Sequence, residues 1–144
     1  MRGQLRLAFG LIVALVVMTA PVARAQAQKT PKSYEKLIYS VKGPDLFRAH
    51  CAACHGLGAK GDGPVAATLK IKPANLTLLA KHYNGKFPEA YVAEVIQSGP
   101  RDAKAHGSKD MPVWGTLFSA TDDPATVKQR IYNLTKYIET LQAN

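Results

Sequence analysis

The sequence predicts an all-α fold in which about four short helices are joined by long loops. The clearest helical pattern lies near the carboxyl end, where apolar residues recur at spacings of four, three, four and three: Val127, Ile131, Leu134, Ile138 and Leu141. No run of residues alternates between apolar and polar types as a half-buried strand would. Four glycines between Gly56 and Gly63 predict a long loop in the first half of the chain.

The first 25 residues have the layout of a secretory signal peptide. Arg2 and Arg6 precede an apolar stretch from Leu7 to Met18, and Ala23-Arg24-Ala25 is a small-x-small cleavage site. The apolar stretch is short for a membrane span. We expect cleavage after residue 25, with Ala27 as a second site and an uncleaved anchor as the alternative. The sequence therefore predicts export to the periplasm.

Removal of this leader bounds the size and charge of the mature protein. It leaves 119 of the 144 residues, which suffices for one domain and is too few for two. Three arginines are lost with it, so the formal net charge falls from +9 to +6. A basic surface suits nucleic acid, a membrane surface or an acidic protein. An exported chain without a nucleic-acid motif argues against nucleic acid, and no stable membrane span is expected after cleavage.

Residues 26–42 are expected to form a polar extension on the surface of a single domain that comprises residues 43–144. The first helix of that domain should begin at Gly43-Pro44-Asp45, which offers a capping glycine, a proline at the first helical position and an acid near the positive end of the helix dipole. This helix is predicted to run to about Cys54.

The end of this helix carries the pentapeptide Cys51-Ala52-Ala53-Cys54-His55. CxxCH is the attachment signature of c-type haem. The two thiols can each add to a vinyl group of the porphyrin, and the adjoining imidazole of His55 can bind the iron. The motif therefore predicts one covalently bound haem c with His55 as an axial ligand.

Three other interpretations of the two cysteines compete with haem attachment. A CxxC pair can be a thioredoxin-like redox site, half of a zinc site or a simple disulfide. The redox pair normally follows a strand, whereas the residues before Cys51 are predicted to be helical. A zinc site would need a second CxxC or a clear pair of histidines, and the sequence has neither.

Further helices and loops follow in order along the chain. Residues 65–69 should form a short helix, and residues 70–79 an extended loop that Pro73 interrupts. A helix is predicted over 88–97, with Gly99 beyond its end.

Residues 98–110 lack apolar periodicity and should be a loop. The last helix should begin at Asp123, a good N-cap, with Pro124 behind it.

Met111 is the candidate for the sixth iron ligand. Met1 and Met18 lie in the predicted leader, so Met111 is the only thioether expected in the mature chain. A thioether suits iron, and Pro112 restricts the backbone that presents the sulfur. The alternative is that Met111 fills an apolar gap. His82 and His106 are the rival ligands, whereas His50 lies on the wrong side of the first cysteine to reach the opposite face.

From Gly43 to Leu141 the chain resembles a bacterial class I cytochrome c that has a single haem and a GDGP loop. The resemblance rests on the spacing of Gly43, Phe47 and Cys51, on Gly61-Asp62-Gly63-Pro64, on the MPxWG segment at Met111, and on the pair Leu134 and Tyr137. It implies the cytochrome c fold, with short helices and long loops around the haem. It also implies that the two terminal helices cross at Gly43, with their aromatic rings interlocked.

The same resemblance assigns roles to four further positions. In that family the axial methionine corresponds to Met111, and a proline carbonyl accepts the proton of the ligand histidine, which orients the imidazole. Pro73 is the candidate acceptor and Pro64 the alternate. Trp114 is similar to the aromatic residue that packs beside the haem, although filling the core is an equally good role for it.

Ligation of the iron by His55 and Met111 would leave no open coordination site, so we expect a one-electron carrier rather than an enzyme. The alternatives are a haem sensor or peroxidase-like protein with a displaceable sixth ligand, and the cytochrome subunit of a larger periplasmic dehydrogenase or oxidase. Either a monomer or a subunit of a redox complex fits the sequence.

Lysines in the expected haem-surrounding loops suggest that the redox partner docks through an acidic patch. A solvated basic surface is the alternative. The lysines concerned are Lys60, Lys70, Lys72, Lys81, Lys86, Lys104 and Lys109.

Overall fold

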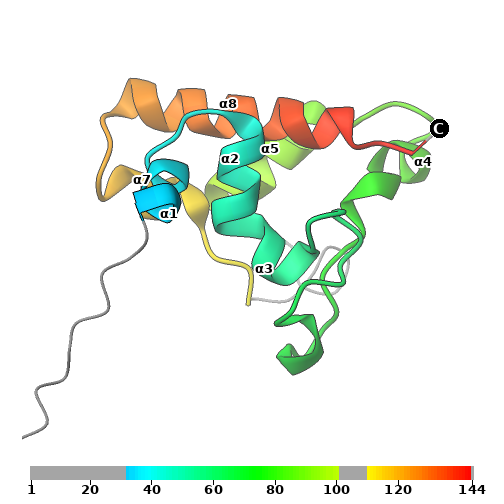
Figure 1. The fold of residues 1–144 in the computed structure, drawn as a ribbon. Coiled ribbons are helices and arrows are strands. Elements are labelled where there is room, and N and C mark those ends of the chain that lie inside the picture. The colour runs from blue at the N-terminus through cyan, green and yellow to red at the C-terminus, as the bar shows by residue number, and fades with distance from the viewer. Residues whose placement is uncertain (1–31, 101–109, 144) are drawn as a thin grey trace, which may run out of the picture.

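Figure 1 shows a computed structural model of the chain, which describes residues 32–100 and 110–143. Within these two ranges the chain forms helices, turns and loops and contains no strand, as the sequence predicts. The described part also has no helix that is long and apolar enough to span a membrane. The predicted signal peptide lies outside the described residues, as do the candidate ligand His106 and the two lysines Lys104 and Lys109.

The predicted first helix is present as three consecutive segments. They are α2 (Gly43–Leu46), the π-helix η1 (Phe47–Cys51) and α3 (Ala52–His55). The helix cap differs from the prediction, because Lys42 is the N-cap and Gly43 is the first helical residue. The three segments are continuous, so the pentapeptide lies at the end of one helical run. Leu46 and Phe47 of this run are buried in the core.

The longest helix is α8 (Pro124–Thr140), and it begins as predicted. The Asp123 side chain accepts hydrogen bonds from the backbone N–H groups of Ala125 and Thr126, at 2.9 and 3.1 Å, so it satisfies two of the free donors at the helix start. The apolar stripe of α8 is buried at Ile131, Leu134 and Ile138. This stripe supplies one wall of the hydrophobic core.

Helices α2 and α8 cross at the position that the resemblance implied. A Cβ atom on Gly43 would collide with the carbonyl oxygen of Asn133 and with Cβ of Tyr137, so only glycine permits this approach. One turn further on, the rings of Phe47 and Tyr137 meet edge to face with centroids 5.5 Å apart. The crossing of the terminal helices is therefore confirmed.

Two shorter helices pack against α8 from the other side. Helix α5 (Glu89–Ser98) agrees with the prediction to within one residue, and Gly99 ends it with a φ of +79°. Helix α7 (Trp114–Ser119) was not predicted, because no helix was expected between residues 97 and 123. The hydrophobic core of the described residues combines buried side chains of the packed helices with Ala59 of the glycine-rich loop: Leu46, Phe47, Ala52, Ala59, Val92, Ile96, Phe118, Ile131, Leu134 and Ile138.

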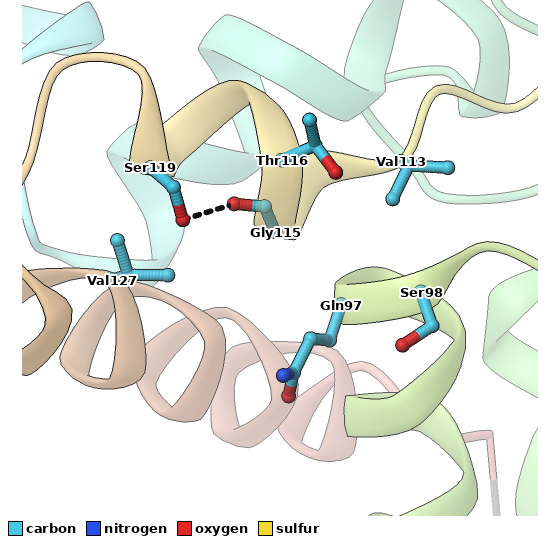
Figure 2. A pocket seen from close by; sticks show the side chains of 7 residues that line it. All are labelled: Gln97, Ser98, Val113, Gly115, Thr116, Ser119 and Val127. Atoms are coloured by element: carbon cyan, nitrogen blue, oxygen red, sulfur yellow. Dashed lines mark hydrogen bonds between the residues drawn. The ribbon is translucent and has the colours of Figure 1, made fainter.

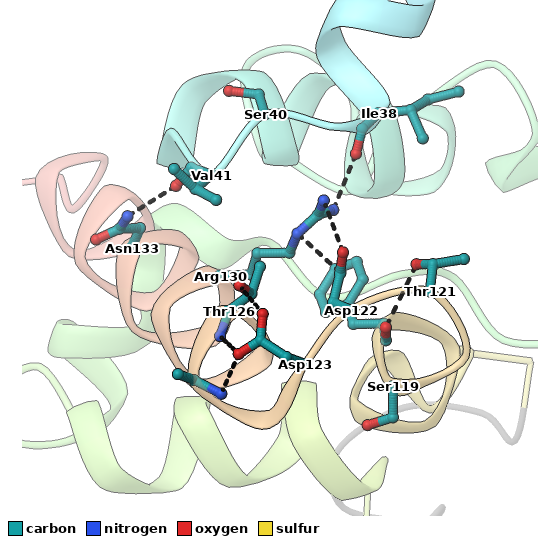
Figure 3. Close-up of polar contacts among 12 residues, drawn as sticks. Ile38, Ser40, Val41, Ser119, Thr121, Asp122, Asp123, Thr126, Arg130 and Asn133 are labelled. Atoms are coloured by element: carbon teal, nitrogen blue, oxygen red, sulfur yellow. Dashed lines mark hydrogen bonds and ion pairs between the residues drawn. The ribbon is translucent and has the colours of Figure 1, made fainter.

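The described part of the extension, from residue 32 on, is hydrogen-bonded to α8 (Figure 3). Its helix α1 (Lys32–Ile38) is followed by a segment whose carbonyl groups accept side-chain hydrogen bonds from α8. Arg130 donates to Ile38 at 2.9 Å and Asn133 donates to Val41 at 2.7 Å. These bonds fix the extension on the surface of the domain.

The middle of the chain contains only short helical turns. The predicted helix at 65–69 is a single 3₁₀ turn, η2 (Ala66–Thr68). The extended loop predicted over 70–79 ends early, because η3 (Leu76–Leu78) and α4 (Leu79–His82) begin within it. His82 is exposed at the end of α4.

Candidate functional site

The pentapeptide lies where η1 passes into α3. Cys51 and Cys54 are both free thiols, and Cys51 packs against the hydrophobic core. Burial raises the pKa of Cys51 to about 12, and the neighbouring Cys54 adds to the effect. Catalytic redox cysteines need the opposite, a lowered pKa that favours the thiolate. The local environment therefore argues against a thioredoxin-like redox pair.

The zinc interpretation of the cysteines also loses support. Over residues 32–100 and 110–143, no three His, Cys, Asp or Glu side chains are grouped so that they could hold a metal ion. Structural zinc sites need four such ligands.

The glycine-rich loop after the pentapeptide is hydrogen-bonded directly to it. The backbone N–H groups of Gly61, Gly63 and Val65 donate to carbonyl groups of the helix end, at 2.8 Å to His55, 3.1 Å to Cys54 and 3.1 Å to Ala53. Helix ends leave their last carbonyl groups without partners inside the helix, and this loop supplies the partners. The sequence pattern GDGP therefore has a local structural function, because it holds the loop under α3.

Gly63 allows the glycine-rich loop to approach the backbone of the pentapeptide closely. A Cβ atom at this position would collide with backbone atoms of Ala52, Ala53 and Cys54. Any other residue would push the loop away from the pentapeptide and break its hydrogen bonds to the helix end.

The imidazole of His55 is oriented by one hydrogen bond to the backbone. Its Nδ1 lies 3.0 Å from the carbonyl oxygen of Ala74. A carbonyl oxygen only accepts, so Nδ1 carries the proton and Nε2 keeps the lone pair that a metal requires. Burial lowers the pKa of His55, which the bond to Ala74 partly opposes. A neutral imidazole of this tautomer is the form that binds iron.

The acceptor of this hydrogen bond corrects the prediction. We expected the carbonyl group of Pro73, with Pro64 as the alternate, and the structure has the carbonyl group of Ala74. The carbonyl oxygen of Pro73 lies instead against Gly61, where a Cβ atom would touch it. The carbonyl oxygen of Ala74 also lies near Gly61, but it is the one that reaches Nδ1 of His55.

Three of the nine exposed large apolar side chains of the described residues lie in the loop region that follows the pentapeptide. Leu57 is 74% exposed, Ile71 47% and Val65 38%. Single exposed apolar residues are common, but several on one loop beside a CxxCH helix end provide the apolar contact that a porphyrin needs. This surface, the two thiols and the tautomer of His55 are together compatible with a covalently bound haem.

Met111 and Trp114 flank the start of α7. Met111 is half-buried in the turn before the helix. Trp114 is half-buried and packs against the core, with its ring centroid 5.0 Å from that of His50 and 5.8 Å from that of Phe118. Trp114 thus has the core-filling role that was one of its two predicted roles.

His50 is part of an aromatic cluster and not of the site around His55. Its ring also meets Phe118 edge to face at 5.3 Å. Burial lowers the pKa of His50, and the positive charge of Arg130 lowers it further, whereas a backbone hydrogen bond at Ile38 opposes both effects.

Figure 2 shows a groove of about 540 Å³ between α5, α7 and α8. Its lining residues are Gln97, Ser98, Val113, Gly115, Thr116, Ser119 and Val127. None of these side chains is charged or readily titratable, so they provide no acid–base group for catalysis. A second cavity of about 200 Å³ is lined by the cluster around His50 and Arg130. Neither lining includes a residue of the pentapeptide.

Comparison with known proteins agrees with the geometry. A family model described as cytochrome c matches residues 40–142, which is most of the chain and nearly all of its described part. Searches of the curated proteins and of the solved structures found no match.

Proposed function

The chain belongs to the cytochrome c family, and on that premise we propose that it is a periplasmic one-electron carrier whose haem iron is held by His55 and Met111. Membership implies a covalent haem c and electron transfer through it, and proteins of this family are typically electron carriers without enzymatic activity. The export, the second ligand and the partner are parts of the proposal.

The observation that carries the proposal is the hydrogen bond from Nδ1 of His55 to Ala74. It fixes the tautomer and the ring orientation, and it increases the electron donation of the imidazole. Cys51 and Cys54 would hold the porphyrin through two thioether bonds. The haem, when bound, supplies an iron that changes between Fe(II) and Fe(III) by one electron. The chain holds its ligand in place, so little has to move when the charge changes.

Met111 is proposed as the second axial ligand for three reasons. It is the only methionine outside the predicted leader. It lies in a turn between Asp110 and α7, and Pro112 limits the freedom of the backbone beside it. Helix α7, which follows, is anchored in the core through Phe118. A sulfur ligand presented from a rigid segment suits an electron carrier, because it is retained in both oxidation states and raises the reduction potential.

The proposed partner is a redox protein with an acidic patch. The lysines of the set named above that the structure describes are all exposed, namely Lys60, Lys70, Lys72, Lys81 and Lys86. Like charges on one surface steer an oppositely charged partner and speed its association. Salt would screen such steering, so the rate of electron transfer to an acidic partner protein should fall as ionic strength rises. A rate independent of salt would contradict the docking proposal.

The axial ligands are tested with the purified haem protein and two variants. The unchanged protein and His82→Ala should both show the methionine-to-iron charge-transfer band at the red end of the ferric spectrum. Met111→Ala should lose it and should bind carbon monoxide rapidly in the ferrous state. If the unchanged protein lacks the band and binds carbon monoxide rapidly, Met111 is not a ligand and a sensor or peroxidase-like function is favoured.

Export and haem attachment are tested by mass spectrometry of the protein from its native host. The expected mass is that of residues 26–144 plus one haem. A mass that includes residues 1–25 would contradict cleavage. Purification of the protein together with a large dehydrogenase or oxidase subunit would change the proposal from a free carrier to a subunit of a complex.

A further inference from the structure

Gln142, just beyond α8, joins the carboxyl end of the chain to the middle of the sequence. Its side-chain Nε2 donates to the carbonyl groups of Leu76 and Ile138, at 2.7 and 2.9 Å. Its Oε1 accepts a hydrogen bond from the backbone N–H of Ala80 at 2.8 Å. Figure 1 shows the carboxyl end of the chain beside α4, where these bonds are made. One side chain therefore uses both its donors and its acceptor to hold two segments together.

The backbone of the next residue strengthens the same contact. The N–H of Ala143 donates to the carbonyl group of Thr77 at 2.8 Å. Chain ends fray unless they are tied down. Here the last described residues make three hydrogen bonds to η3 and the start of α4. The partners are the backbone groups of Leu76, Thr77 and Ala80.

The segment that Gln142 holds is continuous with the acceptor of the His55 hydrogen bond. Ala74 precedes Leu76 by two residues, and the N–H of Leu76 donates to the carbonyl group of Ala59 in the glycine-rich loop at 2.8 Å. Between them, Asn75 accepts a hydrogen bond from the N–H of Thr77 at 3.0 Å, which stiffens the turn. The position of the Ala74 carbonyl group therefore depends on the short segment 74–80, whose later residues are hydrogen-bonded to Gln142.

We propose that Gln142 is a positioning residue for His55, which holds the turn at residues 76–80 and thereby keeps the Ala74 carbonyl group against Nδ1. Gln142 does not touch the imidazole, and it acts through the backbone of the segment that it anchors. The effect on the iron rests on the proposed function, because it needs a haem bound at His55.

The expected direction follows from the chemistry of the ligand. A hydrogen bond to Nδ1 makes the imidazole a better electron donor, and this favours Fe(III). If the acceptor becomes mobile, the imidazole donates less and Fe(II) is favoured. Loss of the Gln142 hydrogen bonds should therefore raise the reduction potential and expose the Nδ1 proton of His55 to exchange with water.

Two substitutions separate the hydrogen bonds from other effects. Gln142→Leu keeps a side chain of similar size and the same charge but removes every side-chain hydrogen bond. Gln142→Glu keeps an acceptor for Ala80 but cannot donate to Leu76 while the introduced carboxyl is ionised. Gln129→Leu is the matched control, because Gln129 lies on α8 and its side chain donates to Asn133, one turn along that helix, at 2.8 Å.

The measurements are made on the haem-loaded proteins. In Gln142→Leu we expect the His55 Nδ1 proton, followed by NMR in the ferrous state, to exchange at least about tenfold faster, which corresponds to about 1.4 kcal/mol. The reduction potential should rise. Gln142→Glu should show the same faster exchange at neutral pH and should recover when the introduced carboxyl is protonated. Gln129→Leu should match the unchanged protein in both measurements.

A purely structural role for Gln142 gives a different result. Gln142→Leu would then lower the free energy of unfolding while the exchange of the Nδ1 proton and the reduction potential stayed at their original values, and the proposal would be wrong. Failure of the proposed function is recognised separately. In that case the unchanged protein itself would carry no thioether-bound haem, which its mass and visible spectrum report.

Discussion

Arg130 of α8 donates a hydrogen bond to the carbonyl oxygen of Ile38 across 92 positions of sequence, at a distance of 2.9 Å. The same guanidinium forms an ion pair with Asp122, with Nε 3.1 Å from Oδ2, and the two side chains are only 5% and 12% exposed. Figure 3 shows Arg130 between α1 and the turn that precedes α8. The arginine therefore joins the extension, the turn and the last helix.

Arg130→Met should destabilise the protein by about 3 kcal/mol, because it leaves Asp122 as a buried charge without its partner. The free energy of unfolding in guanidinium chloride measures this loss. The double variant with Asp122→Asn should recover part of it, since no unpaired charge remains. Lys136→Ala removes exposed ion pairs with Glu89 and Glu139 and should leave the stability almost unchanged. An equally mild effect of Arg130→Met would contradict the role given to the arginine.

Gly43→Ala should lower the free energy of unfolding by about 3 kcal/mol, which is at the upper end of the usual cost of overpacking. The new methyl group would collide with backbone and Cβ atoms of α8, and these cannot move aside. Denaturant unfolding of the haem-loaded protein measures the effect. Gly58→Ala is the control, because the nearest atom that its new methyl group would meet is 3.9 Å away, on the flexible side chain of Lys60. Its stability should stay within about 0.5 kcal/mol of the original value. Equal stabilities for the two variants would rule out the close helix crossing.

Gly63→Ala should lower the fraction of protein with covalent haem, and it should change the packing of the helical core less. The methyl group would push the glycine-rich loop away from the carbonyl groups of Ala53 and Cys54, so the loop would lose about 2 kcal/mol of packing and hydrogen bonding. We expect a lower fraction of protein with covalent haem, measured as haem absorbance per mole of polypeptide. The Gly58→Ala protein, changed in the same loop, should load normally. Full loading of Gly63→Ala would show that the loop contact is dispensable.

Because of His50, the free energy of unfolding should decrease as the pH is lowered. Its pKa is lower in the folded protein than the ordinary value of about 6.5, mainly because of burial, so the folded state favours the neutral ring. The stabilisation is complete above about pH 6.5 and is lost as the pH falls through the folded pKa. His50→Phe, which preserves ring contacts with Trp114 and Phe118, should flatten this part of the pH profile of unfolding. Identical slopes for both proteins below pH 6.5 would refute the assignment.

Several local features could be predicted because their cause lies within a few residues of sequence. The N-cap at Asp123, the stripe of α8 and the end of α5 at Gly99 are confirmed, and each depends on neighbours along one helix. The crossing at Gly43 was implied by the resemblance to a family, and the structure confirms it. The roles of Cys51 and Met111 toward a haem remain predictions.

Other features were missed because distant segments decide them. Residues 70–79 were predicted to be an extended loop, but η3 and α4 begin within it and are hydrogen-bonded to Gln142, which is more than 60 positions away. Helix α7 is six residues long, too short to give a clear period, and it is held by packing against α5 and α8.

The sequence by itself determined the helical class, the limits of the strongest helices and the CxxCH pentapeptide, because periodicity, caps and motif spacing act over a few residues. Only the tertiary structure decided that the carbonyl group of Ala74, and not that of Pro73, meets the imidazole of His55. The two carbonyl groups belong to adjacent residues, and both oxygens lie near Gly61. Their orientation depends on contacts with the glycine-rich loop and on the segment anchored by Gln142, which no local pattern records.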